Sequence, residues 1–243
     1  MRTLPFLLPL IGHGALIAFT VFLFIGPFHL LALPLDAVPI LVFDAGLCLL
    51  FFLQHSLMIR KKARERIARR IPKRWFGALY AMVSAGILLL LVLAWQESPW
   101  RIASAEGGVR WLLQGIFLLA VIGQLWLSRS LEKTLDVFGE KALRRDPSEA
   151  PPPPPPLLTT GLYAWVRHPA YFTIVVLFWS YPNLTADRLL LNVLFTVWII
   201  IGAFLEERDL VAIRGEEYRA YQRATPMLIP YRLPASVRRK QTP

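Results

Sequence analysis

The sequence of 243 residues lacks the features of a disulfide-stabilised domain and of an ordinary soluble domain. It contains one cysteine, Cys48, so no disulfide bond can form within the chain. Charged residues make up 18% of the chain and hydrophobic residues 56%, whereas about a quarter of the residues in a soluble domain are charged. These shortages exclude a small disulfide scaffold and argue against a soluble globular fold.

Charge is also absent from long stretches of the chain. Residues 75–95 and 111–128 contain no Asp, Glu, Lys or Arg, and each is close to the ~20 residues that a helix needs to cross a bilayer. Four further stretches are similarly apolar, at residues 4–28, 38–58, 170–186 and 189–205. We therefore predict an all-α, polytopic membrane helical bundle of about six transmembrane helices. Its last two helices are expected to form a hairpin that turns at Asp187 and Arg188.

The basic residues are concentrated at alternate ends of these stretches. The net charge is +11, and nine Lys and Arg lie between Arg60 and Arg74, whereas residues 29–37 contain none. The positive-inside rule then places both termini in the cytoplasm of an integral membrane protein, with a bacterial inner membrane as the expected setting. Attraction to anionic membrane lipid accounts for the remaining excess of positive charge, so no nucleic-acid partner is expected.

Three segments follow from this pattern. Residues 1–128 form a four-helix N-terminal membrane half, and residues 129–160 form a cytoplasmic linker. The linker contains six consecutive prolines, Pro151–Pro156, which favour a polyproline II spacer because proline fixes φ and lacks an amide donor. Residues 161–243 hold the hairpin, a short cytoplasmic helix near residues 215–221 and a basic tail.

Several kinds of chemistry have no motif in this sequence. We find no P-loop, no zinc-ligand spacing and no nucleophile elbow, so no metal site is expected. The sequence Gly12-His13-Gly14 lies inside an apolar stretch without a preceding strand, which excludes a dinucleotide-binding fold.

Two ionisable clusters are expected to meet at one end of the hairpin. Arg167 and His168 precede Pro169, at the start of a helix whose free amides favour an anion. Glu206 and Glu207 follow an uncharged stretch and have no Lys or Arg three or four residues further on. They must therefore find a partner across the bundle or bind a ligand. A structural ion pair between Arg167 and one glutamate is the alternative.

Two further groups of residues are expected at the same depth in the membrane as these two clusters. Tyr218 and Tyr221 are three residues apart and share a helix face, where they either pack under the bundle or cover a ligand. Gln54, His55 and Ser56 lie near the end of the second apolar stretch. For this histidine, a functional role and ordinary hydrogen bonding both remain open.

These residues together resemble the integral-membrane methyltransferase superfamily that includes isoprenylcysteine carboxyl methyltransferase. The resemblance lies in Arg167-His168-Pro169-x-Tyr171, Glu206-Glu207-x-x-Leu210 and Tyr218-x-x-Tyr221. Three other segments are similar to the branch of NnrU and methanethiol S-methyltransferase: Gln54-His55-Ser56-x-Met58, Asp136-x-Phe138-Gly139 and Thr225-Pro-Met-Leu-Ile-Pro230.

The resemblance implies S-adenosylmethionine bound between the Arg-His-Pro segment and the double glutamate. Arginine suits its carboxylate, a glutamate suits its ammonium or ribose hydroxyls, and tyrosine rings suit its adenine or sulfonium. On this basis the cofactor-binding residues are Tyr163, Arg167, His168, Tyr171, Glu206, Glu207, Tyr218 and Tyr221. The catalytic group comprises His55, Gln54 and Arg167.

The implied reaction is methylation of a small or lipophilic thiol, with the conversion of methanethiol to dimethyl sulfide as the leading case. Because the thiolate is the nucleophile, His55 is expected to take the proton while Gln54 orients it. The alternatives are an isoprenylcysteine-type carboxyl methyltransferase, a non-enzymatic NnrU-type membrane protein of nitrogen-oxide respiration, and a membrane reductase that uses a nicotinamide cofactor. The sequence does not indicate an oligomeric state.

Overall fold

The structure is a computed structural model that describes residues 4–132, 139–144 and 156–234. Two features singled out in the sequence lie outside these ranges: prolines 151–155 of the expected spacer, and residues 136–138 of the segment that ends at Gly139.

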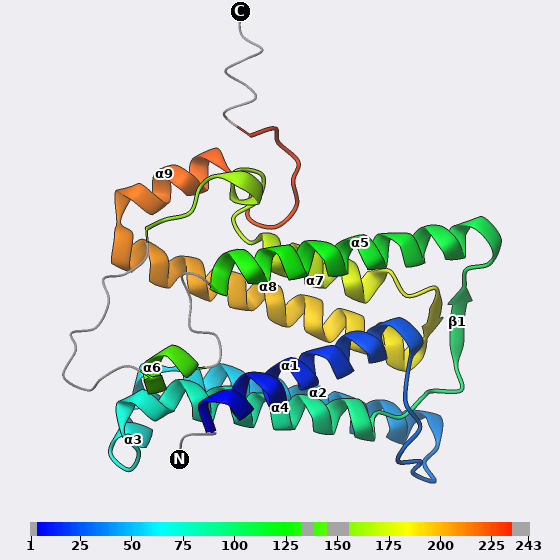
Figure 1. Ribbon diagram of the computed structural model, residues 1–243. Coiled ribbons are helices and arrows are strands. Elements are labelled where there is room, and N and C mark those ends of the chain that lie inside the picture. Colours follow the sequence, from blue (N-terminus) through cyan, green and yellow to red (C-terminus); the bar gives the residue numbers. More distant parts are fainter. Residues whose placement is uncertain (1–3, 133–138, 145–155, 235–243) are drawn as a thin grey trace, which may run out of the picture.

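The described chain is mostly helical, as the sequence predicts (Figure 1). Its α-helices are α1 (Leu4–Ile25), α2 (Ala37–Ile59), α3 (Lys61–Ala68), α4 (Phe76–Ala94), α5 (Gly107–Glu132), α6 (Glu140–Arg144), α7 (Pro169–Trp179), α8 (Ala186–Arg214) and α9 (Glu216–Ala224). Single 3₁₀ turns occupy Lys73–Trp75 and Gly161–Ala164, and two short strands are β1 (Arg101–Ser104) and β2 (Asn183–Thr185).

Four helices of the described chain are long and apolar enough to cross a membrane. They are Ala37–Ile59, Lys73–Ala94, Gly107–Arg129 and Ala186–Arg214. Two apolar helices are shorter, Leu10–Ile25 and Pro169–Trp179. Length and hydropathy therefore support an integral membrane protein. Four of the six predicted crossing segments have spanning length, and crossing by the two shorter helices stays a prediction.

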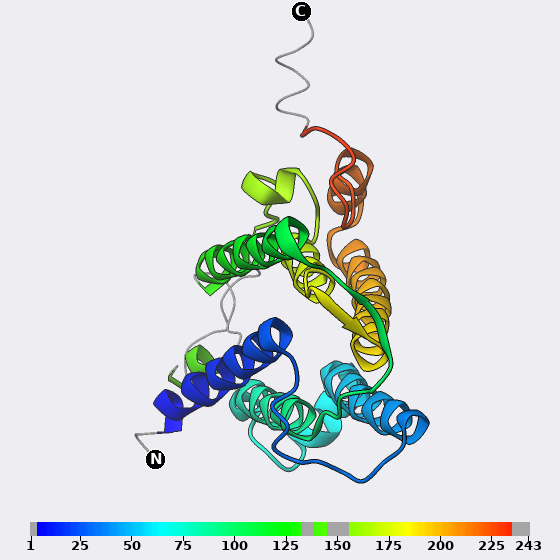
Figure 2. The same cartoon turned by 90° about the vertical axis from the view of Figure 1, so that its right-hand side faces the viewer.

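The helices pack as two layers, with α5, α7 and α8 over α1, α2 and α4 (Figures 1 and 2). Neighbours in space follow the order α1, α4, α2, α8, α7, α5. The interior is filled mainly by aromatic rings. Phe195 of α8 is the common neighbour, with ring centroids 5.6 Å from Phe19 of α1, 4.9 Å from Phe52 of α2 and 5.2 Å from Phe178 of α7. Such pairs add to the stabilisation from buried apolar area.

The strands close one end of the bundle, which we call the sheet end. Strand β1 pairs with β2 in antiparallel fashion, from Arg101 opposite Thr185 to Ser104 opposite Asn183. Just beyond β2, the buried carboxylate of Asp187 accepts hydrogen bonds from Trp95 Nε1 and the Ser98 amide, each at 3.0 Å. The connection after α4 is thereby fixed to the start of α8.

The structure corrects the predicted hairpin. Helix α7 ends at Trp179 rather than at residue 186, because Pro182 has no amide to donate and the next three residues pair with β1. Asp187 and Arg188 do not form the turn; both are buried in the first turn of α8, where the acidic side chain also favours the positive end of the helix dipole.

The opposite end, where α7 begins and α8 ends, carries α9, and we call it the α9 end. Helices α3 and α6 lie at this end in Figure 1. The turn before α6 approaches the start of α4 so closely that a Cβ on Gly139 would overlap the backbone of Gly77 and Ala78. Gly139 also has φ +72°, a conformation that favours glycine.

Candidate functional site

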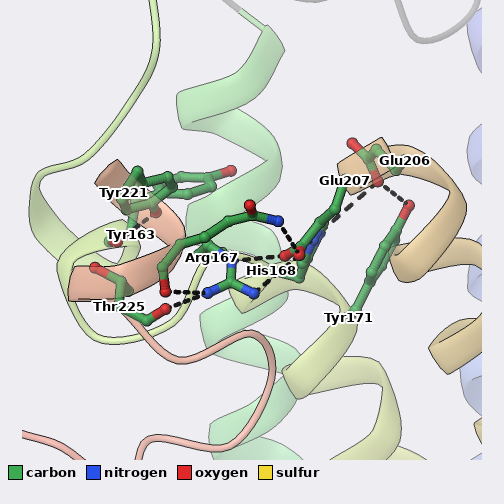
Figure 3. Close-up of polar contacts among 9 residues, drawn as sticks. Tyr163, Arg167, His168, Tyr171, Glu206, Glu207, Tyr221 and Thr225 are labelled. Carbon is green, nitrogen blue, oxygen red and sulfur yellow. Dashed lines mark hydrogen bonds and ion pairs between the residues drawn. The ribbon is translucent and has the colours of Figure 1, made fainter. Parts of the chain in front are cut away.

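The two ionisable clusters meet at the α9 end around Glu207 (Figure 3). Arg167 precedes α7, and its guanidinium donates two hydrogen bonds to the Glu207 carboxylate of α8, Nε to Oε1 at 2.6 Å and Nη2 to Oε2 at 2.9 Å. Both side chains are at least 90% buried, with exposed fractions of 9% and 7%. Charge-assisted pairs of this two-point kind are strong and fix orientation.

The other donors of Arg167 bind the chain near the end of α9. Its Nη1 donates to the carbonyl oxygen of Gln222 at 3.0 Å and to that of Thr225. The amides of Arg167 and His168 donate to the carbonyls of Pro226 and Met227 at 2.9 and 3.1 Å. These two amides are therefore occupied rather than free for an anion, and the ion pair given above as the alternative is formed.

Glu207 receives two further hydrogen bonds. His168 Nε2 lies 3.2 Å from Oε1, and Gln222 Nε2 donates to Oε2 at 2.8 Å. We refer to Glu207, Arg167, His168 and Gln222 as the Glu207 cluster. A buried carboxylate with this many donors is held ionised, and it joins the start of α7, the end of α8 and α9.

Glu206 has a different environment, because successive residues on a helix point about 100° apart. Its side chain is 48% exposed and accepts a hydrogen bond of 2.9 Å from the Tyr171 hydroxyl. The Tyr171 ring stacks on the His168 ring with centroids 5.1 Å apart and planes 3° from parallel. His168 Nδ1 also lies 3.7 Å from Glu206 Oε2. The adjacent glutamates thus share His168 but differ in burial: Glu207 is enclosed by protein donors, and Glu206 remains accessible.

Glu206 lines a cavity of about 360 Å³ at the α9 end. Seven of the eight residues that the resemblance assigns to the cofactor also line it: Tyr163, Arg167, His168, Tyr171, Glu206, Tyr218 and Tyr221. The eighth, Glu207, is not among the lining residues. Sequence reasoning missed Leu157, Leu158 and Arg214 in the wall; the apolar pair directly after the proline run was the available signal.

The tyrosines combine packing with cavity lining. Tyr218 and Tyr221 are buried, with rings 5.8 Å apart and nearly perpendicular, and the Tyr221 hydroxyl donates to the Tyr163 carbonyl at 2.5 Å. Burial, reinforced by the negative charge of Glu207, raises the pKa of Tyr218 to about 12. Burial and the charge of Glu206 also raise the pKa of Tyr163. These phenols therefore stay neutral near pH 7.

The proposed catalytic pair on α2 lies outside this cavity. The His55 ring packs against Phe51, Tyr80 and Trp198 at 5.4, 5.1 and 5.2 Å between centroids. Gln54 Nε2 donates to Ser84 Oγ of α4 at 3.2 Å. The pair is thus enclosed between α2, α4 and α8, and Gln54 is hydrogen-bonded to α4 rather than to His55.

Comparison with known proteins gives the family. The family model described as "NnrU protein" matches residues 44–232 of this chain. The chain belongs to the NnrU family. This agrees with the branch indicated by its motifs, and the match covers all the residues discussed in this section.

The curated relatives of this NnrU-family protein include proteins named methanethiol S-methyltransferase and proteins named Nurim. A protein named methanethiol S-methyltransferase from a Pseudomonas strain is 37% identical over 203 residues, covering 78% of this chain and 73% of the relative. One of the same name from Mycobacterium tuberculosis is 30% identical, covering 84% and 82%. Nurim from Rattus norvegicus is 30% identical, covering 75% and 72%. No solved structure matches the chain.

Proposed function

We propose that this NnrU-family protein is an S-adenosylmethionine-dependent membrane methyltransferase that methylates a small or lipophilic thiol, with methanethiol converted to dimethyl sulfide as the leading case. The observation that carries the proposal is the cavity at the α9 end, into which Glu206 faces while Glu207 is bound by Arg167. The names of the methanethiol S-methyltransferase relatives support it.

The lining residues fit the chemistry of S-adenosylmethionine. The accessible Glu206 carboxylate suits its ammonium group or ribose hydroxyls, and Arg214 in the wall suits its carboxylate. The faces of Tyr163 and Tyr171 suit adenine or the sulfonium cation. A volume of about 360 Å³ lies within the usual range of small-molecule sites.

The residues of the chain contribute mainly by position. The Glu207 cluster fixes the start of α7 and thereby places Tyr171 and Glu206; Arg167 is a positioning residue in this scheme. When bound, the cofactor supplies an electrophilic methyl group. Holding the two reactants together in a water-poor site then provides much of the acceleration. His55 takes the proton of the thiol, since the thiolate is the nucleophile.

The proposal includes the topology. Helices α1 and α7 complete a set of six membrane-crossing segments, and both termini and the α9 end face the cytoplasm, of a bacterial inner membrane. The basic helix α3 supports this orientation because it lies at the α9 end, where the positive-inside rule places cationic residues.

Titration calorimetry on the detergent-purified protein tests cofactor binding. Wild type is expected to bind S-adenosylmethionine, and Glu206→Gln to bind it at least about tenfold more weakly, since a charged hydrogen-bond partner is lost. Glu216→Gln is the matched control, because Glu216 is exposed on α9 and pairs with Arg223. The absence of binding by wild type would overturn the proposal.

A headspace assay for dimethyl sulfide, run beside a prenylcysteine analogue, identifies the acceptor. Dimethyl sulfide is the expected product. Methylation of the prenylcysteine carboxylate alone would instead establish the isoprenylcysteine-type alternative.

A non-enzymatic membrane protein is the alternative that this proposal has to exclude. In that case the Glu207 cluster is structural, and the purified protein forms no methylated product from any thiol supplied with S-adenosylmethionine.

A further inference from the structure

Three buried polar atoms between α2 and α4, towards the α9 end of the bundle, have no hydrogen-bond partner within the described chain. They are Gln54 Oε1, His55 Nδ1 and the Tyr80 hydroxyl, and we call these residues the Tyr80 group. Leaving such atoms unpaired in an apolar interior is costly, so nearly all buried polar atoms in proteins are paired. Three together on facing helices indicate a place that a ligand completes.

The three residues are held in one place. The His55 and Tyr80 rings lie 5.1 Å apart between centroids. Gln54 donates to Ser84, which lies one helical turn after Tyr80 on α4. Gln54 therefore keeps α2 against α4 with its amide nitrogen, while its carbonyl oxygen remains available.

The Tyr80 group adjoins the proposed cofactor site. Tyr80 lies in the second turn of α4 and Tyr171 in the first turn of α7, and both helices begin at the α9 end. Tyr171 in turn donates to Glu206 and lines the cavity at the α9 end. A small molecule held by His55 and Tyr80 would thus lie at the same end of the bundle as the cavity.

The surroundings of the group are aromatic. Phe51 and Trp198 pack on the His55 ring, and Phe76 stacks on the Tyr80 ring at 6.4 Å. Arg64 lies on Phe76, 5.0 Å from its ring centre, and no cation is hydrogen-bonded to the group itself among the described residues. A carboxylate entering such a site would lose its hydration without gaining a cationic partner.

A neutral thiol fits these groups better. Its S–H can donate to the imidazole nitrogen, and its sulfur can accept from the phenol, so both unpaired atoms are satisfied without importing a charge. The ring walls also favour a short alkyl group over a prenyl chain.

We propose that the acceptor of this methyltransferase is a small neutral thiol bound between His55 Nδ1 and the Tyr80 hydroxyl, and that Tyr80 is a catalytic residue that donates a hydrogen bond to the reacting sulfur. This inference rests on the proposed function. The thiol proton passes to His55 Nδ1. The thiolate sulfur forms a bond to the methyl carbon as the bond between that carbon and the sulfonium sulfur breaks, and the bonding electron pair stays on the departing sulfur as a neutral thioether.

The test is Tyr80→Phe, which keeps the ring and removes the hydroxyl. Calorimetry with ethanethiol, with and without S-adenosylhomocysteine, is expected to show roughly a twofold to tenfold loss of affinity, and turnover of ethanethiol to fall roughly tenfold to a hundredfold as the sulfur becomes charged. Affinity for S-adenosylmethionine is expected to stay at the wild-type value. Because the hydroxyl has no hydrogen-bond partner among the described residues, the melting temperature should not fall.

Tyr181→Phe is the control. Its hydroxyl donates to the Ile25 carbonyl at the sheet end at 3.2 Å, so the melting temperature should fall while ethanethiol affinity and turnover stay unchanged.

Each outcome separates the two proposals. Wild type that binds ethanethiol but not S-adenosylmethionine overturns the proposed function and leaves the thiol site standing. Unchanged ethanethiol affinity and turnover in Tyr80→Phe overturn the thiol site alone.

Discussion

At the residue scale, two adjacent glutamates have acquired different surroundings. The Glu207 carboxylate accepts hydrogen bonds from four nitrogen atoms of the protein. Glu206 instead accepts a hydrogen bond from the Tyr171 hydroxyl and lines the cavity. The sequence predicts that both lack local partners, which is correct. It does not predict which one pairs with Arg167, because that depends on how α8 is rotated against the start of α7.

Replacing Glu207 is therefore expected to affect folding more than replacing Glu206. Glu207→Gln leaves Arg167 buried without its counter-charge, which should lower the free energy of unfolding by about 3–5 kcal/mol. The measurement is thermal or denaturant unfolding in detergent, with Glu206→Gln as the control. Equal melting temperatures for the two variants would contradict the role assigned to the Glu207 cluster.

At the scale of the elements, hydropathy predicts α2 and α4 to within one residue at each end, because an uncharged apolar run of this length is typical of a membrane helix. It makes α5 four residues too short at each end, and α8 ends at Arg214 rather than at residue 205 because charged residues continue the same helix beyond the apolar stretch. The end of α7 could not be predicted in the same way. It depends on pairing of residues 183–185 with 101–104, about eighty positions earlier. Nor does the sequence indicate that the Asp187 carboxylate accepts hydrogen bonds from Trp95 and Ser98 rather than from water.

The contact between α4 and the turn before α6 gives a test at this scale. Gly139→Ala places a Cβ against the backbone of Gly77 and Ala78 at positive φ, so the free energy of unfolding should fall by at least about 1–2 kcal/mol.

Gly86→Ala on α4 is the control, since nothing lies within 4 Å of the Cβ position of Gly86. It should leave stability unchanged or raise it by about 0.5–1 kcal/mol through helix propensity. A loss of stability in Gly86→Ala equal to that in Gly139→Ala would show that the close approach is unimportant.

At the scale of the whole molecule, the two ends of the bundle differ in composition. The sheet end has the strand pair and the buried Asp187, which accepts hydrogen bonds from Trp95 and Ser98, while the α9 end has the cavity of about 360 Å³ and the basic helix α3. The charge distribution of the sequence predicts this difference between the two ends. The Tyr80 group could not be inferred in the same way, since an unpaired buried atom becomes visible only when every neighbour is placed.

Orientation can be measured because the chain has a single, buried cysteine. In a Cys48→Ala background, Ala220→Cys on α9 and Ala103→Cys on β1 both place a thiol at an exposed position. With a membrane-impermeant maleimide, Ala103→Cys should react in intact cells and Ala220→Cys only after permeabilisation. The reverse pattern would place the α9 end outside the cytoplasm.

The hydrogen bonds of Arg167 bear on biosynthesis. Its partners include Gln222 and Thr225, and its own amide binds Pro226, all of which follow the last apolar helix. During translation every membrane helix can therefore leave the ribosome before the site has its full set of partners. A chain that stops at Arg214 should still insert into the membrane with Arg167 paired to Glu207, but it would lack Gln222 and the carbonyl partners of Arg167. Completion of the site is therefore a late and separate step that quality-control proteases can inspect.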